Sequence, residues 1–179
     1  MKPHWNRVKD TLNALGYLVK SSDLDGIDLY FTNSSDEAHS KDRRKLIHTF
    51  NRVTPRGICH MSLALGKILD GYPERTKDQD WGFFSRKKKK KWGLNVYVFT
   101  DGVWDKRHDD ELCGVHEPIA ILLKKLAKEN MVDHHVGIQF VQFGNDRMGT
   151  NRLDRLDRGL KKFGISKYAS KYDRNGTRS

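Results

Sequence analysis

The chain has 179 residues, of which 36% are hydrophobic and 10% aromatic, so its length and composition favour one folded domain over a disordered chain. Its longest uninterrupted apolar run, residues 119–123, is far shorter than the ~20 residues of a membrane helix. No apolar signal-peptide segment opens the sequence. We therefore expect no membrane contact and a cytoplasmic protein, with the nucleus as the alternative compartment. The two cysteines, Cys59 and Cys113, lack paired metal spacing and are expected to be reduced thiols.

The positive charge is concentrated in two segments. The chain carries 34 Lys and Arg against 23 Asp and Glu, a formal net charge of +11. Residues 152–179 hold nine basic and three acidic residues, and six consecutive basic residues form a second segment: Arg86, Lys87, Lys88, Lys89, Lys90 and Lys91. The remaining residues are nearly neutral, which does not indicate a continuous nucleic-acid-binding face. We expect a domain over residues 1–163 and a basic, flexible tail over 164–179.

The first half of the chain contains three predicted helices and one predicted strand. Apolar residues at three- and four-residue steps predict a helix over residues 4–20. Residues 27–32 are apolar and bounded by turn residues, which is typical of a buried strand. A polar loop from Asn33 is followed by a predicted helix over 41–51, before Pro55. The next predicted helix contains Met61 and ends at Gly71.

The second half alternates strands and helices. Residues 72–92 form a long polar connection, and residues 94–100 predict a strand that Asp101 and Gly102 close. An acidic loop precedes a predicted helix over 116–130, and residues 136–143 predict a further strand. A final helical pattern covers residues 153–163. This alternation predicts an α/β layer fold with a mostly parallel sheet.

Polar residues at the ends of these strands are the candidate interaction residues. Ligands of open parallel sheets bind beyond the carboxyl ends of the strands, which selects Asn33, Ser34, Asp101 and Asp146. Asp101 is the strongest candidate because a carboxylate freed into a turn suits a hard cation such as Mg²⁺. The alternative interpretation is an aspartate that only stabilises its turn.

Several segments of the sequence together resemble the von Willebrand factor type A (VWA) domain, particularly its fungal and intracellular versions. Residues 25–31, 95–102 and 136–146 resemble the second, fourth and fifth strands of that family. Residues 55–61 with Leu65 resemble the loop and helix that carry a metal-site threonine. The resemblance covers residues 3–160 in order. It implies a three-layer, doubly wound, Rossmann-like sheet with a metal-ion-dependent adhesion site at its top.

The sequence departs from the family at that site. The family's first, central strand with its DxSxS motif has no counterpart, because a helix begins at the start of this chain. Cys59 occupies the threonine position, and a neutral thiol is a poor ligand for a hard cation. Only Asp101 is retained, so we expect a degenerate site without a cofactor, and Mg²⁺ only if the absent strand is supplied.

The absent strand would leave the central sheet incomplete. The resemblance places it between the strands predicted at residues 27–31 and 95–99, whose backbone groups would then lack partners. One hypothesis pairs these two strands directly with each other. In a second hypothesis another chain supplies the strand. The third, which we favour on the sequence, is that the chain is truncated at its amino terminus.

Function is expected to be binding rather than catalysis. The motifs GxGxxG, GxSxG and HExxH do not occur, which disfavours the enzyme classes that they mark. The resemblance to the VWA domain implies a non-catalytic protein-interaction domain with an unidentified protein partner. The alternative is a nucleic-acid-associated protein that uses residues 86–91 and the basic tail. A third hypothesis is a metal-dependent hydrolase or phosphotransferase using Asp28 and Asp101. The adjacent His134 and His135 are interpreted as a surface turn, because neighbouring side chains on extended backbone point apart.

Overall fold

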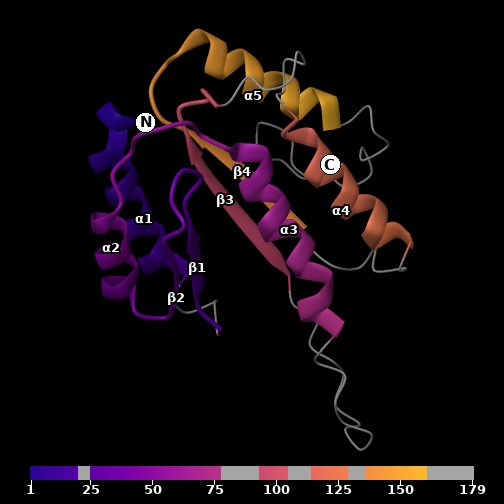
Figure 1. Cartoon of the computed structure of the whole chain (residues 1–179), viewed down its shortest axis with the longest axis horizontal. Helices are drawn as coiled ribbons and strands as arrows, with labels where there is room; N and C mark the ends of the chain where they lie inside the picture. Colours follow the sequence, from indigo (N-terminus) through magenta and orange to yellow (C-terminus); the bar gives the residue numbers. More distant parts are fainter. Residues whose placement is uncertain (20–24, 78–92, 105–113, 129–135, 161–179) are drawn as a thin grey trace, which may run out of the picture.

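The computed structural model describes residues 1–19, 25–77, 93–104, 114–128 and 136–160 (Figure 1). Helices and strands are mixed, which confirms the α/β class in its coarse form. None of the helices in these ranges combines the length and apolarity that a bilayer-spanning helix requires. The elements in chain order are the 3₁₀ turn η1 (Lys2–His4), α1 (Trp5–Val19), β1 (Ile27–Tyr30), β2 (Glu37–Ser40), α2 (Arg43–Arg52), α3 (Met61–Lys77), β3 (Leu94–Thr100), α4 (His116–Lys128), β4 (Val136–Gln142) and α5 (Arg147–Leu160).

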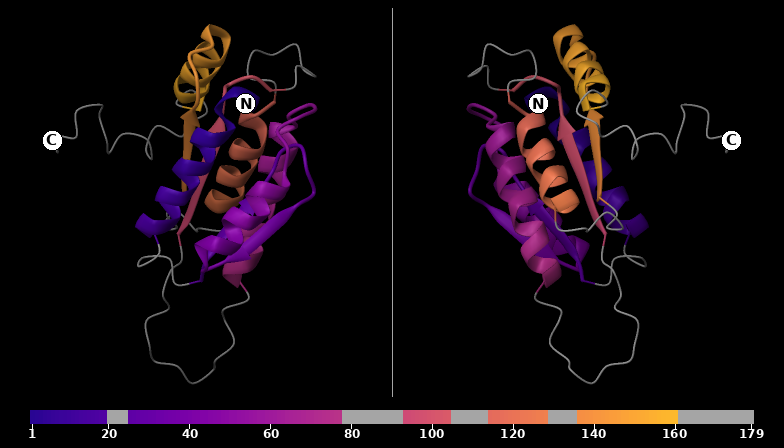
Figure 2. Two further views of the ribbon diagram at one scale, coloured as in Figure 1. Left: turned by 90° about the vertical axis from the view of Figure 1, so that its left-hand side faces the viewer. Right: turned by 90° about the vertical axis from the view of Figure 1, so that its right-hand side faces the viewer.

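The described strands form two separate pairs. β1 and β2 are antiparallel, in a register from Ile27 opposite Ser40 to Tyr30 opposite Glu37. β3 and β4 are parallel, and their seven-residue register begins with Leu94 opposite Val136. β1 and β3 belong to different sheets, so the hypothesis that residues 27–31 pair directly with residues 95–99 is wrong. The two views of Figure 2, together with Figure 1, place the β1–β2 pair on the side of β3 away from β4.

Three predicted boundaries are also corrected, and one of them is the start of the last helix, because α5 begins at Arg147 rather than near residue 153. β2 lies where a polar loop was predicted, because its inward residues are the small Ala38 and Ser40 and give no hydrophobic signal. α3 does not end at Gly71 but continues to Lys77. An interior glycine costs about 1 kcal/mol relative to alanine, and burial of the adjacent Tyr72, which is 6% exposed, offsets that cost.

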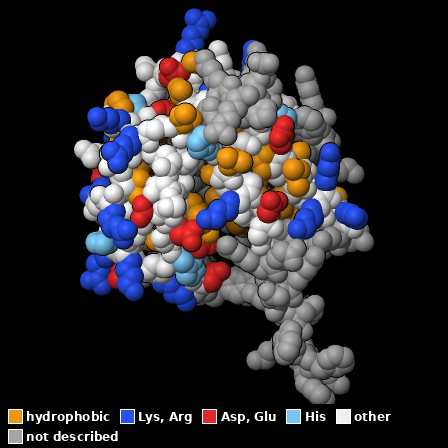
Figure 3. Space-filling model, in the orientation of Figure 1, with side chains coloured by type: hydrophobic (Ala, Val, Ile, Leu, Met, Phe, Trp, Pro, Cys, Tyr) orange, Lys and Arg blue, Asp and Glu red, His pale blue; other side chains and the backbone are white. Residues whose placement is uncertain are grey.

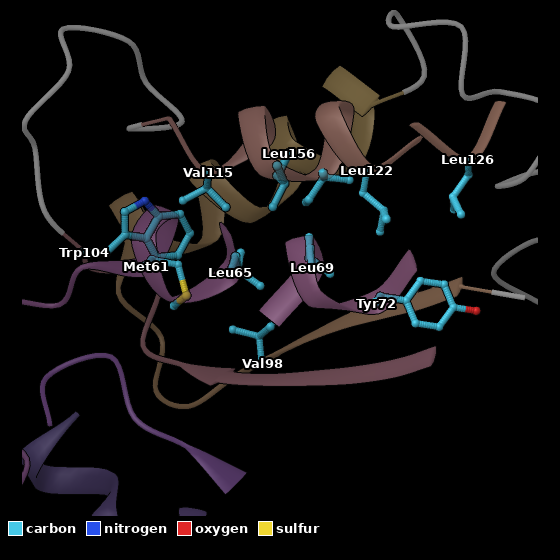
Figure 4. Close-up of a cluster of buried hydrophobic side chains, with 11 residues drawn as sticks. Met61, Leu65, Leu69, Tyr72, Val98, Trp104, Val115, Leu122, Leu126 and Leu156 are labelled. Carbon is cyan, nitrogen blue, oxygen red and sulfur yellow. The ribbon is translucent and has the colours of Figure 1, made fainter. Parts of the chain in front are cut away.

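The larger core cluster lies between the β3–β4 pair and the helices α3, α4 and α5 (Figure 4). Leu65 and Leu69 of α3 are four residues apart on one helical face and belong to the same buried cluster as Val98 of β3. Residues of α4 and α5 close this cluster. Its buried members are Met61, Leu65, Leu69, Tyr72, Val98, Trp104, Val115, Ile119, Leu122, Leu126 and Leu156.

The smaller core cluster is largely aromatic and joins the two strand pairs. Its buried residues are Val8 and Leu12 of α1, Phe50 of α2, and Phe143 just after β4. The ring of Trp5 stacks on Phe50 with centroids 4.2 Å apart. On the β3 side, Phe99 and Phe143 meet edge to face at 5.7 Å. Because Leu29 and Phe31 pack against this cluster as well, it connects β1 to β3 without hydrogen bonds between the strands.

Candidate functional site

Asp101 lies at the carboxyl end of β3, and its side chain is 19% exposed. One carboxylate oxygen, Oδ2, forms an ion pair with the Met1 ammonium. The other, Oδ1, accepts a hydrogen bond from the Val103 backbone N–H at 3.1 Å. The hydroxyl of Thr100 accepts the Gly102 N–H at 3.0 Å. Donors of the chain itself therefore engage both oxygens of Asp101, as in a carboxylate that stabilises its own turn.

Among the described residues, the side chains around Asp101 do not form a metal-binding set. A hard divalent cation needs six or more oxygen ligands, several of them from the protein or from water. In the part of the chain that the structure describes, no group of three or more His, Cys, Asp or Glu side chains is placed to hold a metal ion. Cys59 is half-buried and packs against the larger core cluster. These donors do not fit Mg²⁺, so no step in the function is assigned to a metal.

The turn after β3 is fastened to α5. Gly102 has a positive φ of 79° and lies directly against the backbone of Gly149, so a Cβ at either position would collide with the other segment. Arg152, which is 6% exposed, donates through Nη1 to the carbonyls of Gly102 and Trp104, both at 3.3 Å. Its guanidinium also lies 5.5 Å from the centroid of the Trp104 ring. Sequence reasoning counted Arg152 only as part of a basic segment and missed this role.

Asp146 caps the amino terminus of α5. Its Oδ1 accepts the Gly149 N–H at 2.8 Å, and its backbone carbonyl accepts the Thr150 N–H at 2.9 Å. Thr150 also hydrogen-bonds the side chain of Gln142 in β4. The loop between β4 and α5 is therefore held by a helix cap, which is worth about 1 kcal/mol.

Asn33 and Ser34 follow β1 but belong to different contacts. The Asn33 side-chain amide donates to the backbone carbonyls of Thr54 and Arg56, at 3.3 and 2.5 Å. This ties the end of β1 to the segment that enters α3. The Ser34 hydroxyl instead donates to the Asp36 carboxylate at 2.6 Å, in a local turn.

The amino-terminal turn brings these strand ends together. Met1 contacts Asp101 after β3, and the ring of His4 lies against Gly144 after β4. Trp5 lies 6.4 Å from Phe31, centroid to centroid, after β1. The ends of β1, β3 and β4 therefore share one end of the molecule, where Figure 2 shows the N label.

The same end carries exposed apolar side chains that sequence reasoning missed. Each comes from a different segment: Ile58 precedes α3 and is 61% exposed, Val103 follows β3 and is 41% exposed, and Met148 in the first turn of α5 is 44% exposed. The sequence signal that could have found them is a glycine next to each apolar residue: Gly57 before Ile58, Gly102 before Val103 and Gly149 after Met148. We define the strand-end surface as these three residues with the polar residues of the same end: Asn33, Ser34, Asp101, Asp146, Ile58, Val103 and Met148.

The other predicted residues do not join this surface in the described part of the chain. The Oδ1 of Asp28 lies 2.9 Å from Nδ1 of His39 across the β1–β2 pair, so the proposed pair of Asp28 with Asp101 is not formed. The basic run 86–91, His134, His135 and the tail 164–179 lie outside the described residues.

Figure 3 shows Lys and Arg side chains on several parts of this face, some of them at the lower left, where α2 lies. Arg43, Arg44 and Lys45 are exposed there. Arg44 is hydrogen-bonded to the Asp42 carboxylate, which lowers the pKa of that carboxyl group.

No family model, curated protein or solved structure matches this chain. The VWA resemblance therefore stays a prediction, and function is inferred from the contacts of the strand-end surface itself.

Proposed function

We propose that this chain is a non-catalytic, VWA-type protein-interaction domain with a degenerate metal site, and that the strand-end surface is where it binds. The observation that carries the proposal is the exposure of Ile58, Val103 and Met148, which lie on three segments at the same end of the molecule. Exposed apolar side chains that come together on a surface are typical of protein-binding sites, whereas single ones need no explanation.

The polar surroundings support the same proposal. Interfaces between proteins combine an apolar centre with a polar rim, and Asn33, Asp101 and Asp146 supply polar groups at the same strand ends.

The rigidity of the segments also favours binding. The contact between Gly102 and Gly149, the two hydrogen bonds of Arg152 and the Asp146 cap hold the segments that carry Val103 and Met148. A surface ordered before binding avoids the entropic cost of ordering side chains and loops on association. A partner would therefore meet a preformed site.

Photo-crosslinking tests the location of the site. A photoreactive amino acid is placed singly at positions 58, 103 and 148, and at the matched exposed positions Leu18, Leu63 and Ile121, which are 70%, 66% and 55% exposed on α1, α3 and α4. We expect a shared protein product from the first three positions in cells that express the chain, identified by mass spectrometry. A product formed equally from the control positions would contradict the proposal.

The purified partner then gives the affinity. We expect the triple variant Ile58→Ser, Val103→Ser, Met148→Ser to weaken binding by about 100-fold, from roughly 1 kcal/mol for each exposed side chain lost from the contact. The control triple variant Leu18→Ser, Leu63→Ser, Ile121→Ser is expected to stay within about twofold. An equal loss in both variants would place the contact elsewhere.

The degenerate metal site is tested separately by calorimetric titration with Mg²⁺ and Mn²⁺. We expect no stoichiometric binding, because Asp101 already bonds to Met1 and Val103. Tight binding that the Asp101→Ala variant abolishes would show that the site is functional.

A second candidate function is association with nucleic acid. The exposed Arg43, Arg44 and Lys45 on α2 favour it, together with the basic run 86–91. It predicts binding to a labelled DNA duplex or RNA strand that weakens steeply with salt. Replacing Arg86 and the five lysines with glutamine should flatten that slope, and binding that is absent or insensitive to salt would exclude this function.

A further inference from the structure

β3 has one edge bonded to β4 and one edge that faces away from it. The Phe143 N–H donates to the Thr100 carbonyl at 2.7 Å, so the backbone groups of Thr100 point to the β4 side. In a strand the N–H and C=O of one residue point to the same side, and successive residues alternate. The N–H and C=O groups of Asn95, Tyr97 and Phe99 therefore point to the opposite edge, toward the β1–β2 pair.

In the described part of the chain, β3 itself lacks the sequence features that usually prevent strand addition. Among the described residues, β3 pairs only with β4, and β1 only with β2. Natural edge strands are protected by charge, proline, bulges or short length. β3 is seven residues long, pairs in an uninterrupted register and contains neither a charged residue nor a proline. β2 is different, because it has four residues and an exposed Glu37.

The side chains of β3 indicate the chemistry of an occupant. Val96 and Val98 face the larger core cluster, while Phe99 packs against the smaller one. A strand added beside β3 would have apolar neighbours on both of its faces. A charge in that strand would lose its water without gaining a partner from β3. Tyr97, which is 40% exposed, adds apolar surface at the middle of the edge.

We propose that the Asn95–Tyr97–Phe99 edge of β3 binds an extended segment of a partner protein as an added strand. The segment has about five to seven residues, is apolar at successive positions, and contains no charge or proline at its centre. The backbone groups of the edge supply affinity, and the two core clusters select apolar side chains. This site is separate from the strand-end surface and does not depend on the function proposed for it.

A displayed library of random nonapeptides, selected against the full chain, provides the probe. We expect enrichment of peptides with a run of β-branched and aromatic residues and without central proline or charge. Amide exchange, followed residue by residue with the enriched peptide present, should slow by about tenfold or more at Asn95, Tyr97 and Phe99. The amides of Ile138 and Phe140, which face the outer edge of β4, are the internal control and should not change.

N-methylation of the enriched peptide tests the strand geometry without altering the protein. Methyl groups on the alternate amides that face β3 should weaken binding by about tenfold or more, because hydrogen bonds are lost. Methylation of the intervening amides should weaken it less. The variant Tyr97→Pro, which removes one edge N–H, should also reduce binding, and the peptide pair keeps the test valid if this variant does not fold.

Three results would overturn the proposal. The first is the absence of any enriched peptide, and the second is protection at Ile138 and Phe140 instead of the β3 edge. The third is self-association without peptide that protects the same β3 amides, which would identify a second copy as the occupant. The triple variant Ile58→Ser, Val103→Ser, Met148→Ser should keep full peptide binding, so failure of the strand-end surface and failure of the β3 edge are distinguishable.

Discussion

The two halves of this molecule are built from different kinds of side chain. The larger half, α3, α4 and α5 with β3–β4, encloses mainly aliphatic residues from helices on its own sheet. The smaller half, α1 and α2 with β1–β2, depends on aromatic rings and includes Phe99 and Phe143 from the strand pair of the larger half. The smaller half is therefore completed by the larger one, and this dependence is expected to run in one direction.

The largest expected effect is that of Phe50→Ala in the smaller half. Phe50 is 3% exposed and stacks on Trp5, and loss of a buried phenylalanine typically costs about 3–5 kcal/mol. Native-state amide exchange should show faster opening of α1 and α2 while α3 stays protected. If the amides of α3 lose as much protection, the two halves open as one unit and the one-way dependence is refuted.

Leu65→Ala is expected to cost about 2–5 kcal/mol, because Leu65 is 2% exposed within the larger cluster. Unlike Phe50→Ala, it should destabilise both halves, as measured by urea unfolding followed by amide exchange. Leu63→Ala on the same helix is the control, since Leu63 is 66% exposed and should change stability by no more than about 0.5 kcal/mol. If the amides of α1 stay protected from exchange in Leu65→Ala, the smaller half does not depend on the larger half, and the proposed dependence is refuted.

The variant Arg152→Met tests how much the hydrogen bonds between α5 and the turn after β3 contribute to stability. The change leaves the buried carbonyls of Gly102 and Trp104 without this donor, at an expected cost of about 1–3 kcal/mol. Thermal unfolding should show the loss, whereas Arg158→Met, at an exposed position of the same helix, should be nearly neutral. Equal effects of the two changes would mean that the Arg152 hydrogen bonds contribute nothing.

The smallest effect concerns alkaline pH. Burial raises the pKa of Tyr72 above its ordinary value near 10. The folded state therefore holds this proton more tightly, so its contribution to stability is complete below pH ~10 and is lost as the pH rises through the raised pKa. The free energy of unfolding, measured at about pH 8 and about pH 11, should fall less in Tyr72→Phe than in the wild type. The same fall in both proteins would contradict burial as the cause.

The fold was predictable where the apolar pattern was regular. α1, α4, β3 and β4 appear close to their predicted positions because each buries one face or stripe. β2 has no large apolar residue facing inward, and burial of Tyr72 lets α3 continue past Gly71 to Lys77. The division into two strand pairs depends on contacts between distant residues, which no local pattern encodes.

The candidate site was only partly predictable. Strand-end logic led to Asn33, Asp101 and Asp146, because turn residues after strands are visible in the sequence. The Met1 partner of Asp101 and the carbonyls bound by Arg152 were not predictable, since they come from segments far away in the chain. The apolar residues Ile58 and Val103 were missed because a single exposed side chain in a loop has no periodic signal.

The crossing of Gly102 and Gly149 limits how this sequence can diverge. Either glycine, if replaced alone, would force two backbone segments apart, because neither position has room for even one more carbon atom. Divergent homologues that keep this junction are therefore expected to retain both glycines and Arg152. Homologues that lose the junction are expected to lose both glycines. Gly102, Gly149 and Arg152 therefore give a criterion for recognising distant homologues. It depends on the close approach of two backbone segments rather than on sequence identity over the whole chain.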